Sequence, residues 1–371
     1  MDLFPAVDPI PLPAPVWLFK VLHSATLALH FTAVHLLVGG LAMAAFWALV
    51  GRMRGDEARL NASGALAYRL PVAMAYVINL GVPPLLFAQV LYGRALYTSS
   101  VIIGLYWISV VFLVIAAYFV LYMMAKRAEN GVAYGWLGLI ALAIVLKVAV
   151  IYTNNMTLML RPDAWIEMYR NNPVGGQLNG DDPTVLPRWL FMMIGSLGVA
   201  GVGLILLGMK TRLPASATLL LRRRGGLALA AFTLLQVALA WRVLAAQPES
   251  VRTALAGHAF YRLVALLWLA TAVLLVALGL FAAVRAAKRS WLSATLCGAA
   301  AFVNILLMVL FRDGIRDMAL LQFGYDVWAR EINTNWAIVM LFLALFVGAA
   351  GLVAWMAAVT ARAKGVDETY A

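Results

Sequence analysis

Long apolar stretches recur along the whole of this 371-residue chain and constrain its fold more than any other feature. Nine of them reach about 20 residues or more, the length that an α-helix needs to cross roughly 30 Å of hydrocarbon. The chain is 64% hydrophobic and only 12% charged, far from the composition of soluble proteins. We therefore predict one all-α polytopic integral membrane domain over residues 1–371. Its predicted spans lie near residues 16–50, 71–93, 100–125, 134–160, 187–209, 225–246, 258–284, 290–311 and 333–361.

The basic residues predict how the chain is oriented in the membrane. Sixteen of the 28 Lys and Arg residues fall on one side: Arg52, Arg54, Arg59, Arg69, Lys126, Arg127, Lys210, Arg212, Arg222, Arg223, Arg224, Arg285, Lys288, Arg289, Arg362 and Lys364. This side should be cytoplasmic, so nine spans put the N-terminus outside and the C-terminus inside. The Pro-rich start is not typical of a signal peptide, and we expect the first helix to be retained. The net charge of +12 then reflects orientation and anionic lipid rather than nucleic acid.

Three of the four histidines, His23, His30 and His35, lie on the first apolar stretch. An imidazole inside a bilayer is costly unless its nitrogens are used, and haem iron is a natural user. His23 and His30 are two helical turns apart, about 10.5 Å along one face, so they cannot both ligate one iron. They could serve two cofactors, or one ligand and one hydrogen bond. His35 points roughly 140° away from His30, which favours a polar contact between helices.

Two further polar residues are candidate binding residues. His258 opens the seventh span with Arg262 on the same face, and it could share a site with His23 if the first and seventh spans pack together. Lys147 lies near the centre of the fourth span, where it either snorkels or faces a quinone head group or haem propionate. All sixteen acids map to loops or span ends on the predicted boundaries.

Several cofactor classes are excluded by the sequence. The single cysteine, Cys297, cannot form an internal disulfide, and the absence of a C-x-x-C-H motif excludes covalent c-type haem. Walker and dinucleotide-binding glycine patterns are absent.

Two long segments on the outward side also carry information. Residues 161–187 predict an interfacial amphipathic helix, and residues 311–336 form a charged, aromatic lid or a docking surface above a cofactor.

The order of the motifs resembles a known family. TLALHFTAVHLLVGG in the first span, NLGVPPLLFAQVLYGRALYTSS in the second and third, and FRDGIRDMAL at the end of the eighth are similar to subunit I of the cytochrome bd quinol oxidases. The similarity extends over most of the chain and implies b-type haem and quinol chemistry. It matches His30 to a haem ligand, while Met193 falls near the position of the low-spin haem histidine. Arg312, Asp313 and Arg316 would contact propionates or shape a quinone site.

Two departures from the family bear on mechanism. The acids of the family's third helix are absent, and about ten residues replace its long quinol-binding loop. Without ionisable relays through the membrane, oxygen reduction loses support. We therefore expect a subunit of a bacterial respiratory complex in the cytoplasmic membrane. It would carry electrons through haem b between the quinone pool and an external partner such as a c-type cytochrome. Other membrane subunits of the complex would be its further partners. The alternatives are a bd-type oxygen reductase subunit and a haem-free anchor for peripheral cytochromes.

Overall fold

The computed structural model describes residues 3–5, 11–210, 212–362 and 370. In this part of the chain nine helices are long and apolar enough to cross a membrane, as predicted. They are α1 (Val16–Arg54), α2 (Glu57–Ile102), α3 (Gly104–Glu129), α4 (Gly135–Leu158), α6 (Val185–Lys210), α7 (Ala215–Ala245), α9 (Ala259–Val284), α10 (Trp291–Leu321) and α11 (Trp336–Arg362). Two short helices, α5 (Pro162–Asn171) and α8 (Glu249–Gly257), lie in connections between them. The prediction of an all-α, multi-span membrane protein is confirmed.

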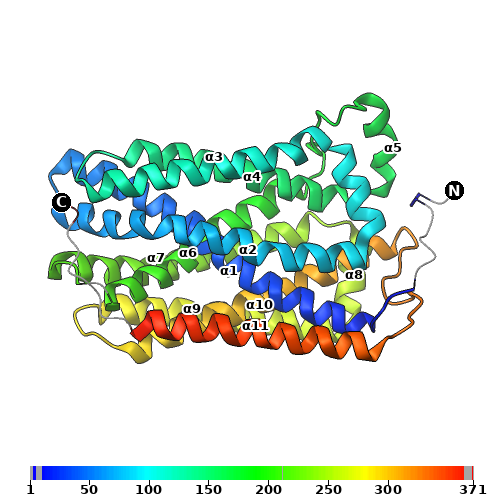
Figure 1. Ribbon diagram of the computed structural model, residues 1–371. Helices are drawn as coiled ribbons and strands as arrows, with labels where there is room; N and C mark the ends of the chain where they lie inside the picture. The colour runs from blue at the N-terminus through cyan, green and yellow to red at the C-terminus, as the bar shows by residue number, and fades with distance from the viewer. Residues whose placement is uncertain (1–2, 6–10, 211, 363–369, 371) are drawn as a thin grey trace.

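The long helices run side by side, and α1 lies inside the bundle (Figure 1). It packs against α2, α4, α6 and α10. We call the end of the bundle where α1 begins the N-side; this end also carries α5, α8 and the loop 322–335 (Figure 1). The last helix, α11, begins at the N-side and ends at the opposite end of the bundle (Figure 1). That the N-side faces the outside of the cell stays a prediction from the distribution of basic residues.

Glycine allows the backbones of neighbouring helices to approach closely. A Cβ atom on Gly39 of α1 would lie only 2.1 Å from the backbone oxygen of Ser196 on α6. A Cβ on Gly226 of α7 would likewise lie 2.5 Å from the backbone oxygen of Gly279 on α9. Such small-residue contacts are typical of helices that associate in lipid, where no hydrophobic effect drives helices together.

Three helices extend well beyond their predicted spans, and one of them, α7, starts at Ala215 rather than near residue 225. Helix α2 starts at Glu57 rather than near residue 71, and it contains Pro71, Pro83 and Pro84 together with a non-helical residue, Tyr92. Helix α10 continues ten residues past the predicted end at 311. The charged sequence there resembles a loop, but Asp313, Arg316 and Asp317 are buried and ion-paired, both carboxylates with Lys20 of α1, so the helix continues through them.

Candidate functional site

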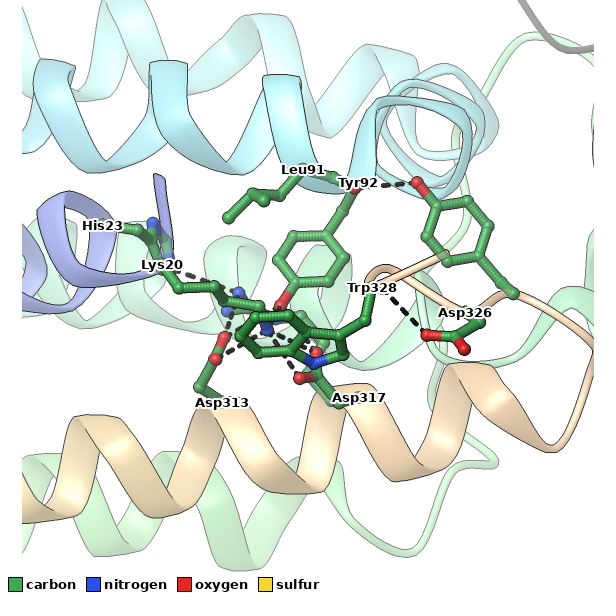
Figure 2. Close-up of polar contacts among 10 residues, drawn as sticks. Lys20, His23, Leu91, Tyr92, Asp313, Asp317, Asp326 and Trp328 are labelled. Carbon is green, nitrogen blue, oxygen red and sulfur yellow. Dashed lines mark hydrogen bonds and ion pairs between the residues drawn. The ribbon is translucent and has the colours of Figure 1, made fainter. Parts of the chain in front are cut away.

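A buried cluster of charged side chains joins α1, α2 and α10 near the N-side (Figure 2). Lys20 Nζ lies 2.8 Å from Asp313 Oδ2 and 2.6 Å from Asp317 Oδ2. Lys20 Nζ also donates a hydrogen bond of 2.6 Å to the Tyr92 hydroxyl. This hydroxyl lies 2.9 Å from Asp313 Oδ1 and 2.8 Å from Asp317 Oδ1, and its one proton serves one carboxylate at a time. None of the four residues is more than 9% exposed, so the ion pairs are shielded from water.

Arg316 and His23 extend this cluster. Arg316 Nη1 donates to Asp313 Oδ1 at 3.3 Å and lies 3.1 Å from His23 Nε2. The other ring nitrogen, His23 Nδ1, lies 3.0 Å from the backbone oxygen of Pro84. Because a carbonyl only accepts hydrogen bonds, Nδ1 carries the proton and Nε2 accepts from Arg316. Both nitrogens of His23 are therefore occupied within the protein, and the two cations of the cluster balance its two carboxylates.

Local backbone geometry brings these side chains together. Asp313 and Asp317 are four residues apart on α10 and therefore lie on one face of that helix. Lys20 stands in the second turn of α1, opposite this face. Tyr92 has φ −128° and ψ 23°, which interrupts α2 at the residue that reaches the carboxylates. From the loop 322–335, the Trp328 ring contacts Lys20, with Nζ 5.5 Å from the ring centroid (Figure 2).

The same loop covers the cluster on the N-side. The Tyr325 hydroxyl donates a 2.8 Å hydrogen bond to the backbone oxygen of Leu91. Burial raises the pKa of Tyr325, so its hydroxyl stays a donor at neutral pH. The Phe4 ring packs against Tyr325 and Trp165, with centroid distances of 5.2 and 5.5 Å. The segment predicted to be a lid therefore lies over a charged cluster; of its aromatic residues Tyr325 is buried, whereas Trp328 and Trp336 are exposed.

His30 differs from His23 in the use of its second nitrogen. His30 Nδ1 lies 3.1 Å from the backbone oxygen of Val77 on α2, so Nδ1 is the protonated nitrogen. Within the described part of the chain, no hydrogen bond is made by His30 Nε2, and the residue is only partly buried. Gly81 of α2 makes room for the ring, since a Cβ there would lie 3.0 Å from His30 Cε1. His30 thus has a fixed ring and a free electron pair.

The remaining two histidines differ sharply in burial. His35 is 1% exposed, and neither ring nitrogen has a hydrogen-bond partner among the described residues. The predicted polar contact of His35 between helices is therefore wrong; its ring stacks on Phe31 instead. His258 is exposed at the start of α9, and its ring contacts Tyr261 at 4.8 Å. The structure does not bring His258 into contact with His23, whose two nitrogens are used by α2 and α10.

The other predicted site residues lie at separate places. Arg312 is partly buried on α10, and its guanidinium lies 5.5 Å from the centroid of the Phe31 ring. Met193 is partly buried on α6, where it makes no polar side-chain contact within the described part. Lys147 is exposed on α4, and its Nζ lies 5.1 Å from the centroid of the Tyr106 ring. Contact with an aromatic ring fits a snorkelling lysine better than a cofactor ligand.

The structure corrects two predictions about charge. Asp313 and Asp317, predicted to follow the end of the eighth span at residue 311, instead lie in the last three turns of α10 and are buried. Lys20 is not among the residues predicted to form the site, although it pairs with both buried carboxylates. A lysine five residues into an apolar span is itself a signal, because an intramembrane cation needs a partner.

Of the histidines on α1, only His30 has a ring geometry that fits an axial ligand to haem iron. An iron-binding histidine usually donates its other N–H to a carbonyl or carboxylate, and His30 does so through Nδ1. His23 does not fit in this arrangement, because Arg316 occupies its Nε2. Among the described residues, no group of three or more His, Cys, Asp or Glu side chains is arranged to hold a separate metal ion.

Comparison with known proteins adds no further assignment. No protein-family model matches the sequence, and no curated protein matches it either.

Proposed function

We propose that this chain is the membrane subunit of a respiratory electron-transfer complex and that it binds b-type haem through His30. The observation that carries the proposal is the state of the His30 ring. Its Nδ1–H is held by the backbone oxygen of Val77, and the lone pair of Nε2 has no partner in the part of the chain that the structure describes. This is the tautomer and orientation that iron coordination requires. An imidazole in a membrane span that has no other use for its nitrogen also favours a ligand role.

The proposed role is electron exchange between the quinone pool and an external redox partner such as a c-type cytochrome. Haem b would supply a one-electron carrier at this place. The surrounding residues supply orientation: Gly81 gives the ring its space and Val77 fixes its rotation. The proposed location is a bacterial cytoplasmic membrane, and the distribution of basic residues supports an orientation with the N-side outside. Further subunits of the complex would complete the path for electrons.

A bd-type oxygen reductase remains the less favoured role. Oxygen reduction consumes protons, and buried carboxylates usually relay them. Asp313 and Asp317, the acids within α10, are both ion-paired to Lys20 and lie within about 12 Å of the N-side end of that helix. Paired carboxylates at one end of the bundle do not make a relay from the opposite side.

The test is spectroscopic and uses the purified full chain in detergent. A pyridine haemochrome assay and a reduced-minus-oxidised spectrum should show haem b. His30→Ala should remove it, whereas His258→Ala should leave the spectrum unchanged because His258 is exposed. Absence of haem from the wild-type chain, or an unchanged spectrum in His30→Ala, would refute the proposal. The haem-free anchor would then be the better account.

A further inference from the structure

Two arginines on adjacent helices of the N-side lack an ion-pair partner among the described residues. Arg312 on α10 makes no hydrogen bond or ion pair within the described part of the chain, and its guanidinium rests on the Phe31 ring. Arg188 stands in the first turn of α6. Its Nη2 donates to Gln247 Oε1 at 2.9 Å, but its buried Nε has no acceptor among the described residues. Both arginines are only partly exposed, so water can accept hydrogen bonds from only some of their N–H groups.

These two charges lie near one another and near a third. Arg312 precedes Arg316 by one turn of α10, and it lies on Phe31. Phe31 shares a hydrophobic cluster with Phe191, which lies one turn after Arg188 on α6. The nearest acids are already engaged. Asp313 pairs with Lys20 and Arg316, and Asp182, which interacts with Arg188 over a longer distance, accepts hydrogen bonds from Asn179 and the Thr184 backbone. Because Lys20 and Arg316 already balance Asp313 and Asp317, Arg188 and Arg312 face only Asp182, which leaves one positive charge in excess.

A third unpaired donor borders the same region. Trp268 of α9 has a buried Nε1–H without an acceptor among the described residues. Its ring packs 6.1 Å from that of Phe191, on α6 three residues after Arg188. Phe31, whose ring contacts the Arg312 guanidinium, belongs to the same hydrophobic cluster as Trp268 and Phe191. All the unpaired groups here are donors, so the missing partner is an acceptor.

An unpaired buried cation in a membrane protein is expensive, and an anion with several oxygens would relieve this cost. We infer that the face between α6 and α10 binds the anionic oxygens of an amphipathic molecule through Arg188 and Arg312. The shared chemistry is a carboxylate or phosphate group held by two guanidiniums, with apolar surface beside it. Such a group is carried by an anionic phospholipid or by a haem propionate. The inference rests on the proposed function only if the bound molecule is haem, and it stands independently of that function if the molecule is a phospholipid.

The first arm of the test measures lipid binding to the purified chain by native mass spectrometry. Phosphatidylglycerol is compared with phosphatidylcholine of the same acyl chains, in a His30→Ala background so that haem plays no part. Binding of phosphatidylglycerol should fall about tenfold or more in Arg188→Gln/Arg312→Gln. The matched control is Arg252→Gln/Arg262→Gln, which removes two exposed charges at the same end. Arg188→Lys/Arg312→Lys keeps the charge and should retain part of the binding.

The second arm measures haem retained per chain after extensive detergent washing, with His30 intact. Lipid binding that depends on the two arginines supports the inference with phospholipid as the source. Haem retention that depends on them, without a preference for phosphatidylglycerol, supports it with propionate as the source. Equal behaviour of the Arg188/Arg312 and Arg252/Arg262 variants in both arms overturns the inference. A haem-free wild-type chain with arginine-dependent lipid binding refutes only the proposed function.

Discussion

Lys20→Met is the sharpest test of the charged cluster. Lys20 is the cation that pairs with Asp317, at 2.6 Å, whereas Asp313 has Arg316 as a second partner at 3.3 Å. Removing Lys20 therefore leaves one buried carboxylate with only the Tyr92 hydroxyl as a partner. Breaking a buried pair by deleting one member costs about 3–5 kcal/mol. We expect the free energy of unfolding to fall by about this amount.

The double variant separates charge imbalance from lost packing. Lys20→Met/Asp317→Asn removes one charge of each sign and leaves Asp313 paired with Arg316. Most of the lost stability should return, with a residual cost of about 1–2 kcal/mol for hydrogen bonds no longer made. Lys147→Met is the matched control, because that lysine is exposed and contacts only an aromatic ring; its expected cost is about 1 kcal/mol or less.

The measurement is denaturant-induced unfolding in a fixed detergent micelle, followed by fluorescence of the 12 tryptophans. The wild-type chain is compared under identical conditions with four variants: Lys20→Met, Asp317→Asn, the double variant and Lys147→Met. If the double variant is as unstable as the sum of Lys20→Met and Asp317→Asn, the carboxylate is not stabilised by Lys20 and our interpretation of the cluster is wrong. A loss in Lys147→Met equal to that in Lys20→Met would refute it as well.

Three other substitutions test local geometry. Gly81→Ala should lower haem content, because its Cβ would lie 3.0 Å from the His30 ring, whereas Gly348→Ala, with nothing within 4 Å, should have no effect on the haem spectrum. Gly39→Ala should destabilise the chain by about 1–3 kcal/mol in the same unfolding assay, since its Cβ would meet an α6 backbone oxygen. Tyr325→Phe should cost about 1 kcal/mol through its lost hydrogen bond. Because burial raises the Tyr325 pKa, its contribution is present below the unfolded-state pKa of about 10 and is lost as pH rises further. Stability of the Phe variant measured from pH 8 to 11 should therefore fall less steeply than that of the wild-type chain.

The number of spans follows from the sequence because each apolar run is long enough to cross the bilayer by itself. The charged cluster does not, because its partners are far apart along the chain. Lys20 and Asp317 are separated by 297 positions, and no local pattern links an isolated lysine to the sequence FRDGIRD. Without that partner the acids suggest a loop, which is why α10 extends further than predicted.

The histidines show a second limit of the sequence. Their spacing predicts that His23 and His30 share a face of α1, and each indeed meets a backbone carbonyl of α2. What distinguishes them is the second nitrogen, and this depends on where Arg316 of α10 lies. The sequence alone does not show that Arg316 of α10 lies next to His23 of α1. The same holds for His35, which packs against Phe31 without any polar contact among the described residues.

The cluster and His30 are connected through the geometry of α1. Lys20, His23 and His30 recur at intervals of three and seven residues, so they lie along one face of the helix. Ion pairs from Lys20 and the contact of His23 with Arg316 fix the rotation of this face relative to α10. Because α1 is a rigid helix, that rotation also directs His30 toward α2, two turns further on. A charge-balanced cluster that uses all its own partners has little capacity left for a ligand. We therefore expect the cluster to position α1, and we propose the Nε2 of His30 as the group that takes part in chemistry.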